Sequence, residues 1–120
     1  MNHIMVVDDD TNFRMSLVIQ LELEGYKVTD FENPNQALAV LEHYQNDKDG
    51  MPELIISDVC MPEVDGEEFV DRINERFPRL PVLVISAFDP PVFLSRYPFL
   101  QKPFKLHDMM STIQRIIRMN

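Results

Sequence analysis

The sequence predicts an α/β domain in which a parallel sheet is covered by helices on both faces. Along its 120 residues, short runs of continuous apolar residues alternate with longer segments in which apolar residues recur at helical spacing. Continuous apolar strands are typical of parallel sheets, because both faces of such a sheet are buried. Ligands of these sheets bind beyond the carboxyl ends of the strands. We therefore expect the functional residues at that edge.

The first apolar run, residues 4–7, predicts a buried strand that stops at three consecutive aspartates. Thr11 can serve as the N-cap of the helix that follows, and Gly25 supplies the end of that helix. The side chains expected to face the core recur at helical spacing: Phe13, Leu17 and Leu21.

Residues 27–31 predict the second strand, and Asn33 can cap the second helix. The apolar face of this helix consists of Ala37, Leu38, Leu41 and Tyr44. After a polar loop over residues 46–52, residues 54–57 predict a third buried strand, which ends at Asp58.

A third helix follows Gly66, and its apolar side consists of Phe69, Val70, Ile73 and Phe77. Residues 81–85 predict the fourth strand, which Ser86 ends, and residues 99–101 predict a short fifth strand, which Lys102 ends. A last helix starts at Leu106 and carries an apolar stripe: Met109, Met110, Ile113, Ile116 and Ile117.

The composition bounds the class of protein. A formal net charge of -9 argues against direct binding to nucleic acid or to an anionic membrane, because both would repel the domain. No apolar run approaches the roughly 18 residues of a membrane span, and the first residues lack the basic region of a secretory signal. The single cysteine, Cys60, excludes an internal disulfide and fits a reducing compartment. We expect one cytoplasmic domain over residues 1–120.

The parallel arrangement brings the polar residues that end four strands to one edge: Asp8, Asp9, Asp58, Ser86 and Lys102. Crowded carboxylates repel one another unless a cation lies among them, and their hard oxygens favour Mg²⁺. We expect Asp9 and Asp58 to bind this ion directly and Asp8 to orient a bound water, with the backbone carbonyl of Cys60 within reach. Asp10 is expected to be an acid of the first helical turn and not a ligand.

A metal, a lysine and a hydroxyl around an ionised aspartate are suited to phosphoryl transfer. The metal and Lys102 would neutralise the oxygens of the transferred group, and the hydroxyl of Ser86 would donate a hydrogen bond to one of them. The carboxylate of Asp58 would be the nucleophile.

Four motifs resemble, in the same order, those of the receiver domain of two-component response regulators. They are residues 5–10, residues 56–62 followed by Asp65 and Gly66, residues 84–87 and residues 102–104. The resemblance implies a flavodoxin-like (βα)5 fold, which is a doubly wound sheet of five parallel strands in the order 2-1-3-4-5. It also implies a signalling module that catalyses only its own phosphorylation and dephosphorylation.

The resemblance also assigns roles to individual residues. Asp58 is the phosphoacceptor, and the donor is a sensor histidine kinase or a histidine phosphotransfer protein. The other assignments are the acidic pair Asp8 and Asp9, the switch hydroxyl Ser86, the phosphate-contacting Lys102, and a cis peptide bond before Pro103. Phe99 falls at the position of a switch aromatic residue, although a core role for it is equally open.

One segment departs from the family. Lys102 follows Ser86 by only sixteen positions, which is shorter than the usual interval by more than a helical turn. The prolines at both ends of the segment disfavour helix before them, so at most residues 92–96 can coil and the fourth helix is shortened or missing. We expect Phe93, Leu94 and Tyr97 to be partly covered. With the fifth strand and last helix they would contact an effector domain, a partner protein or a second copy.

Two alternatives remain open at this point. A haloacid-dehalogenase-type phosphohydrolase would use Asp8 as its nucleophile, but Asn12 stands where threonine or valine is expected and Asp58 is left unexplained. The second alternative is a receiver-like interaction module that works without phosphorylation. The complete set of acceptor residues argues against that module, whereas the short segment before the fifth strand keeps it open.

Overall fold

The computed structural model describes residues 2–46, 50–59, 66–89 and 96–119. Its five strands form one parallel sheet in the order β2-β1-β3-β4-β5, which confirms the predicted order. The strands are β1 (His3–Val7), β2 (Lys27–Phe31), β3 (Leu54–Asp58), β4 (Val82–Ser86) and β5 (Phe99–Gln101). Because all pairs are parallel, the carboxyl ends of all five strands lie at the same edge.

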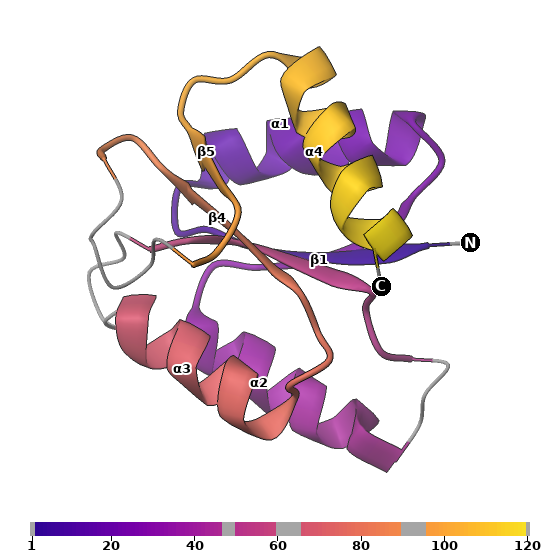
Figure 1. Cartoon of the computed structure of the whole chain (residues 1–120), viewed down its shortest axis with the longest axis vertical. Coiled ribbons are helices and arrows are strands. Elements are labelled where there is room, and N and C mark those ends of the chain that lie inside the picture. Colours follow the sequence, from indigo (N-terminus) through magenta and orange to yellow (C-terminus); the bar gives the residue numbers. More distant parts are fainter. Residues whose placement is uncertain (1, 47–49, 60–65, 90–95, 120) are drawn as a thin grey trace.

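The described residues form four α-helices, and a short 3-10 helix, η1 (Tyr44–Asn46), continues the second of them. The α-helices are α1 (Thr11–Leu23), α2 (Pro34–His43), α3 (Gly66–Arg76) and α4 (Leu106–Met119). Helices α1 and α4 cover one face of the sheet, and α2 and α3 cover the other (Figure 1). The predicted covering of both faces is therefore confirmed.

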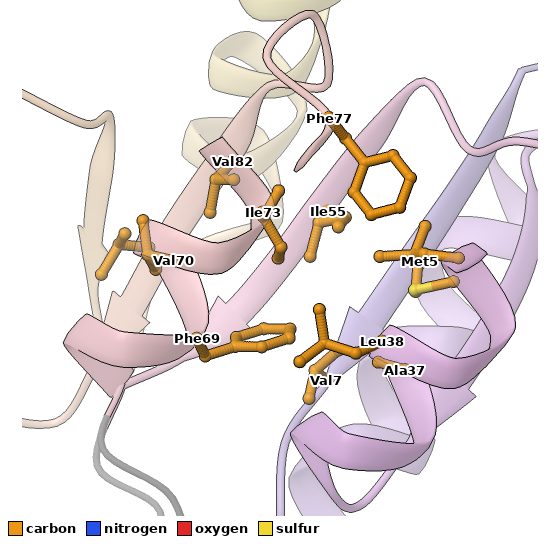
Figure 2. Close-up of a cluster of buried hydrophobic side chains, with 12 residues drawn as sticks. Met5, Val7, Ala37, Leu38, Ile55, Phe69, Val70, Ile73, Phe77 and Val82 are labelled. Atoms are coloured by element: carbon orange, nitrogen blue, oxygen red, sulfur yellow. The ribbon is translucent and has the colours of Figure 1, made fainter. Parts of the chain in front are cut away.

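Each face of the sheet carries its own hydrophobic cluster. Ile4 and Val6 of β1 belong to the cluster under α1 and α4, whereas Met5 and Val7 belong to the cluster under α2 and α3. Figure 2 shows the second cluster, in which the fully buried ring of Phe69 from α3 extends toward β1. Successive residues of a strand are thus buried on opposite sides, which explains why the strands read as continuous apolar runs.

Two of the three residues predicted to bound the first two helices do so in the structure, and the N-cap of α1 differs from the prediction. Asn33 caps α2 by accepting a backbone hydrogen bond with its side chain, and Gly25 follows α1 with a φ of 97°, a left-handed conformation that favours glycine. The N-cap of α1 is Asp10 and not Thr11, which is the first helical residue. The carboxylate of Asp10 accepts the N–H of Phe13 at 3.1 Å, and a charged acceptor binds this unpaired N–H more strongly than a hydroxyl does.

The connection between β4 and β5 is described at residues 87–89 and 96–98, and these residues form no α-helix. The shortened or missing fourth helix is therefore confirmed. Phe93 and Leu94 lie outside the described residues, whereas Tyr97 is half-buried and packs against the cluster under α2 and α3. Among the described helices, none combines the length and the apolar character needed to cross a membrane.

Candidate functional site

The strand register brings the predicted site residues to the carboxyl edge of the sheet. Asp8 follows the end of β1 and Asp58 ends β3, and these two strands are paired side by side. On the other side of β3, Ser86 ends β4, and its carbonyl accepts a hydrogen bond from the N–H of Lys102 at 2.7 Å. Four separate strands therefore contribute to one site.

The ammonium group of Lys102 lies between the carboxylates of Asp8 and Asp58. Its Nζ donates hydrogen bonds to Oδ2 of Asp8 at 2.7 Å and to Oδ2 of Asp58 at 2.8 Å. The exposed fraction of the side chain is 13% for Lys102, 9% for Asp58 and 0% for Asp8. Both ion pairs are therefore largely shielded from water, which strengthens them relative to surface pairs.

Burial and hydrogen bonding act in opposite directions on the pKa values of Asp8 and Lys102. Burial raises the pKa of Asp8 above its ordinary value, and the hydrogen bonds from Lys102 and from the Asp10 N–H only partly oppose that rise. Burial would lower the pKa of Lys102, but the hydrogen bonds to Asp58 and Asp8 outweigh it, so the pKa of Lys102 is raised. Lys102 therefore keeps its positive charge at neutral pH.

Asp8, Asp9 and Asp58 form the carboxylate cluster that the sequence predicts. One ligand oxygen from each residue can be chosen so that all three lie within 4.8 Å of one another. The oxygen ligands of an octahedral Mg²⁺ at about 2.0–2.1 Å would be separated by about 2.9 to 4.2 Å. A small contraction would thus fit the cluster to such an ion, and the exposure of Asp9 leaves the cluster open to solvent.

Asp10 has a different role from its two neighbours. Its carboxylate caps α1, and its N–H donates a hydrogen bond to Oδ1 of Asp8 at 2.9 Å. Asp10 therefore holds the turn between β1 and α1, and it is not a member of the carboxylate cluster.

The remaining predicted site residues lie on β4, on β5 and directly after β5, apart from Cys60. Ser86 is buried, and its Oγ accepts a hydrogen bond from the N–H of Phe88 at 3.0 Å. Phe99 is half-buried and packs against the cluster under α2 and α3. The peptide bond between Lys102 and Pro103 is cis, as the resemblance implies. Cys60 lies outside the described residues.

Two residues of α1 that sequence reasoning did not assign to the site contact it. The buried guanidinium of Arg14 donates from Nη1 to the backbone carbonyl of Asp8 at 2.7 Å and from Nε to Asp30 at 2.9 Å. The Nζ of Lys102 lies 4.0 Å from the centroid of the Phe13 ring. Arg14 precedes the buried Leu17 by three residues, so a charged side chain on the apolar face was the available signal.

The chain belongs to the response regulator receiver domain family, whose model matches residues 4–114. The match includes β1 from its second residue, the other four strands, and every strand end that contributes to the carboxyl-edge site. The protein is accordingly a phosphoacceptor signalling module of two-component systems.

Individual relatives agree with this assignment. The chain is 33% identical over 120 residues to the DNA-binding transcriptional regulator NtrC of Salmonella typhimurium, covering 95% of this chain and 24% of NtrC. It is 32% identical over 123 residues to the response regulator receiver protein CpdR of Brucella abortus, covering 98% of both chains. The structure of the chemotaxis protein CheY4 of Vibrio cholerae matches with a TM-score of 0.81 at 27% identity, covering 97% of this chain and 98% of that chain. The chain thus spans about a quarter of NtrC and nearly all of CpdR.

Proposed function

We propose that Asp58 accepts a phosphoryl group from a phosphohistidine donor, with Mg²⁺ held by Asp8, Asp9 and Asp58. Phosphorylation then changes the surface that partner proteins bind. The observation that carries the proposal is that the buried ammonium group of Lys102 donates hydrogen bonds to both Asp58 and Asp8. In this proposal residues 1–120 act as one receiver domain in the cytoplasm.

Asp58 is a better nucleophile than Asp8. Both oxygens of Asp8 accept hydrogen bonds, one from Lys102 and one from the Asp10 N–H, and the side chain has no exposed surface. Asp58 retains some exposure at the strand end. These contacts disfavour a hydrolase in which Asp8 attacks the substrate. A module that works without phosphorylation is not favoured either, because the lysine and both carboxylates are in contact.

The proposed reaction is a displacement at phosphorus. An oxygen of Asp58 forms a bond to phosphorus while the P–N bond to the donor imidazole breaks, and the imidazole leaves with the electron pair and is protonated. Lys102 neutralises an oxygen of the transferred group, and the hydroxyl of Ser86 donates a hydrogen bond to another. Mg²⁺, when bound, neutralises further charge on the same group. Water then attacks the acyl phosphate, which releases inorganic phosphate and restores the carboxylate of Asp58.

Intact-mass measurement with acetyl phosphate tests the acceptor. The wild type should gain one phosphoryl group with Mg²⁺ and none with EDTA, and Asp58→Asn should gain none. Asp71→Asn, which changes an exposed aspartate of α3, is the matched control and should be labelled like the wild type. Equal labelling of Asp58→Asn would refute the assignment, and a phosphoryl group mapped to Asp8 would favour the hydrolase.

The donor should be a sensor histidine kinase or a histidine phosphotransfer protein that docks on α1. Three apolar side chains recur every four residues along this helix and are largely exposed: Met15, Ile19 and Leu23. The helix begins beside Asp9, so a protein bound along it would approach Asp58. Ile19→Glu should slow transfer from a protein donor and leave the rate with acetyl phosphate unchanged, because the small donor needs no docking. Equal slowing with both donors would contradict this role.

The output surface should include β5 and α4, with the connection before β5. Lys102 directly follows β5, so a contact between its ammonium group and the phosphoryl group would act on that strand. The reader would be an effector domain, a partner protein or a second copy. Hydrogen exchange with and without a beryllium fluoride mimic tests this: protection should change in β5 and α4, and an unchanged pattern there would contradict it.

A further inference from the structure

The ammonium group of Lys102 has a third neighbour besides the two carboxylates. Its Nζ lies 4.0 Å from the centroid of the Phe13 ring, well within the range of about 6 Å in which an aromatic face attracts a cation. Phe13 is the third residue of α1, and its ring is half-buried in the cluster under α1 and α4. The ring therefore closes one side of the space in which the ammonium group lies.

Phe13 is held in place by its backbone and by its ring. The backbone N–H of Phe13 donates to the carboxylate of Asp10, which caps the helix. The ring meets that of Phe104 edge to face, with centroids 5.8 Å apart and an interplanar angle of 87°. Phe104 lies two residues after Lys102, so the ring is fixed between the start of α1 and the segment that carries the lysine.

This inference rests on the proposed phosphorylation of Asp58. That reaction affects the contacts of the ammonium group with Asp8 and Asp58 differently from its contact with the Phe13 ring. Asp58 gains a phosphoryl group and Asp8 faces a metal, so both carboxylates lose much of their attraction for Lys102. The attraction of an aromatic face depends on neither event. We propose that Phe13 is a positioning residue, whose ring, supported by Phe104, keeps the ammonium group of Lys102 where the phosphoryl group arrives.

The first test separates binding of the phosphoryl mimic from binding of the metal. Phe13→Leu keeps an apolar side chain and removes the aromatic face. It should weaken the affinity for beryllium fluoride at saturating Mg²⁺, and slow phosphorylation by acetyl phosphate, by roughly two- to thirty-fold. The affinity for Mg²⁺ alone should stay within about twofold, because an apolar ring supplies no ligand to the metal; a general loss of structure would lower both affinities.

Three further variants complete the design. Phe13→Tyr retains the ring face and should restore most of the affinity for beryllium fluoride. Phe104→Leu should have a smaller effect than Phe13→Leu. Tyr26→Leu, which removes an aromatic ring from the same hydrophobic cluster, is the matched control and should leave that affinity unchanged. Equal losses in Phe13→Leu and Phe13→Tyr, or parallel losses of Mg²⁺ and beryllium fluoride affinity, would overturn the proposal.

A second measurement does not depend on phosphorylation. Protons next to a ring face are shifted upfield in NMR spectra, so the ε protons of Lys102 should be shifted upfield relative to those of the other three lysines. The shift should disappear in Phe13→Leu and persist in Tyr26→Leu. Absence of the shift in the wild type would overturn this inference alone, whereas failure of the wild type to bind beryllium fluoride would overturn the proposed function.

Discussion

Replacing Lys102 by methionine should lower the free energy of unfolding of the metal-free protein by about 3 kcal/mol at pH 7. Methionine retains most of the apolar stem and removes the ammonium group. Asp8 then loses the hydrogen bond from Lys102 and faces Asp58 without the ammonium group between them. Removing one partner of a buried pair costs roughly 3–5 kcal/mol. The lower end applies because Asp8 keeps the Asp10 N–H and Asp58 keeps some exposure to water.

The loss of stability should become smaller as the pH falls. Burial already raises the pKa of Asp8 and Lys102 opposes that rise, so removing the lysine raises this pKa further. A carboxyl group with a raised pKa binds more protons in the folded state than in the unfolded state. Stability attributable to Asp8 therefore increases as the pH falls through its folded-state pKa toward its ordinary value. Urea unfolding in EDTA at pH 7 and at pH 5 measures both effects.

Lys105→Met is the control for this experiment, because Lys105 is exposed three residues further along the chain. It should change the free energy of unfolding by less than about 0.5 kcal/mol. Added Mg²⁺ should restore part of the stability of Lys102→Met, since the ion would replace the missing positive charge. If Lys102→Met unfolds at the same urea concentration as the wild type at pH 7, the two hydrogen bonds of Lys102 do not stabilise the fold.

Three further predictions concern other residues around the sheet. Asp9→Ala should abolish Mg²⁺ binding in calorimetry, whereas Asp10→Ala should leave it nearly unchanged and cost about 1 kcal/mol of stability through loss of the N-cap; equal Mg²⁺ affinities would contradict this. Arg14→Met should cost about 2 kcal/mol or more in urea unfolding, because a buried carbonyl and Asp30 lose their charged donor; a loss below about 0.5 kcal/mol would show that this network does not stabilise the fold. Burial lowers the pKa of His3 below 6.5, so the folded state binds fewer protons and stability should fall as the pH drops below that value. His3→Gln should remove this dependence, and equal slopes in both proteins would refute it.

The strands could be predicted to within one residue, because polar residues bound each apolar run. The differences have local causes. Strand β4 begins at Val82 and not at Pro81, which offers its carbonyl to Ile55 but has no N–H to donate. Strand β1 begins one residue earlier than predicted, since His3 pairs with Lys27 of β2. Convergence of the site residues was equally predictable, because it follows from the parallel direction of the strands.

The supporting contacts of the site could not be predicted in the same way. Helical spacing placed Phe13 in the core, and the structure confirms that it packs there. That its ring also lies against Lys102 depends on how α1 crosses the ends of the strands, which spacing within one helix does not determine. Asp10 and Thr11 are adjacent and both are good capping residues, so capping preference alone does not decide which of them begins the helix.

The charges at the site explain why the lysine needs a neighbour that is not a carboxylate. Asp8, Asp9 and Asp58, when ionised, and the ammonium group of Lys102 together carry two net negative charges. One Mg²⁺ would balance them. Phosphorylation then replaces the single negative charge of Asp58 by a phosphoryl group that carries about 1.5 to 2 negative charges, and this group draws the ammonium group away from its original partners. A lysine held only by Asp8 and Asp58 would have no fixed position during this exchange, whereas the uncharged ring of Phe13 attracts the ammonium group before and after it. The effect of Phe13→Leu should therefore be larger on beryllium fluoride binding than on the stability of the metal-free fold.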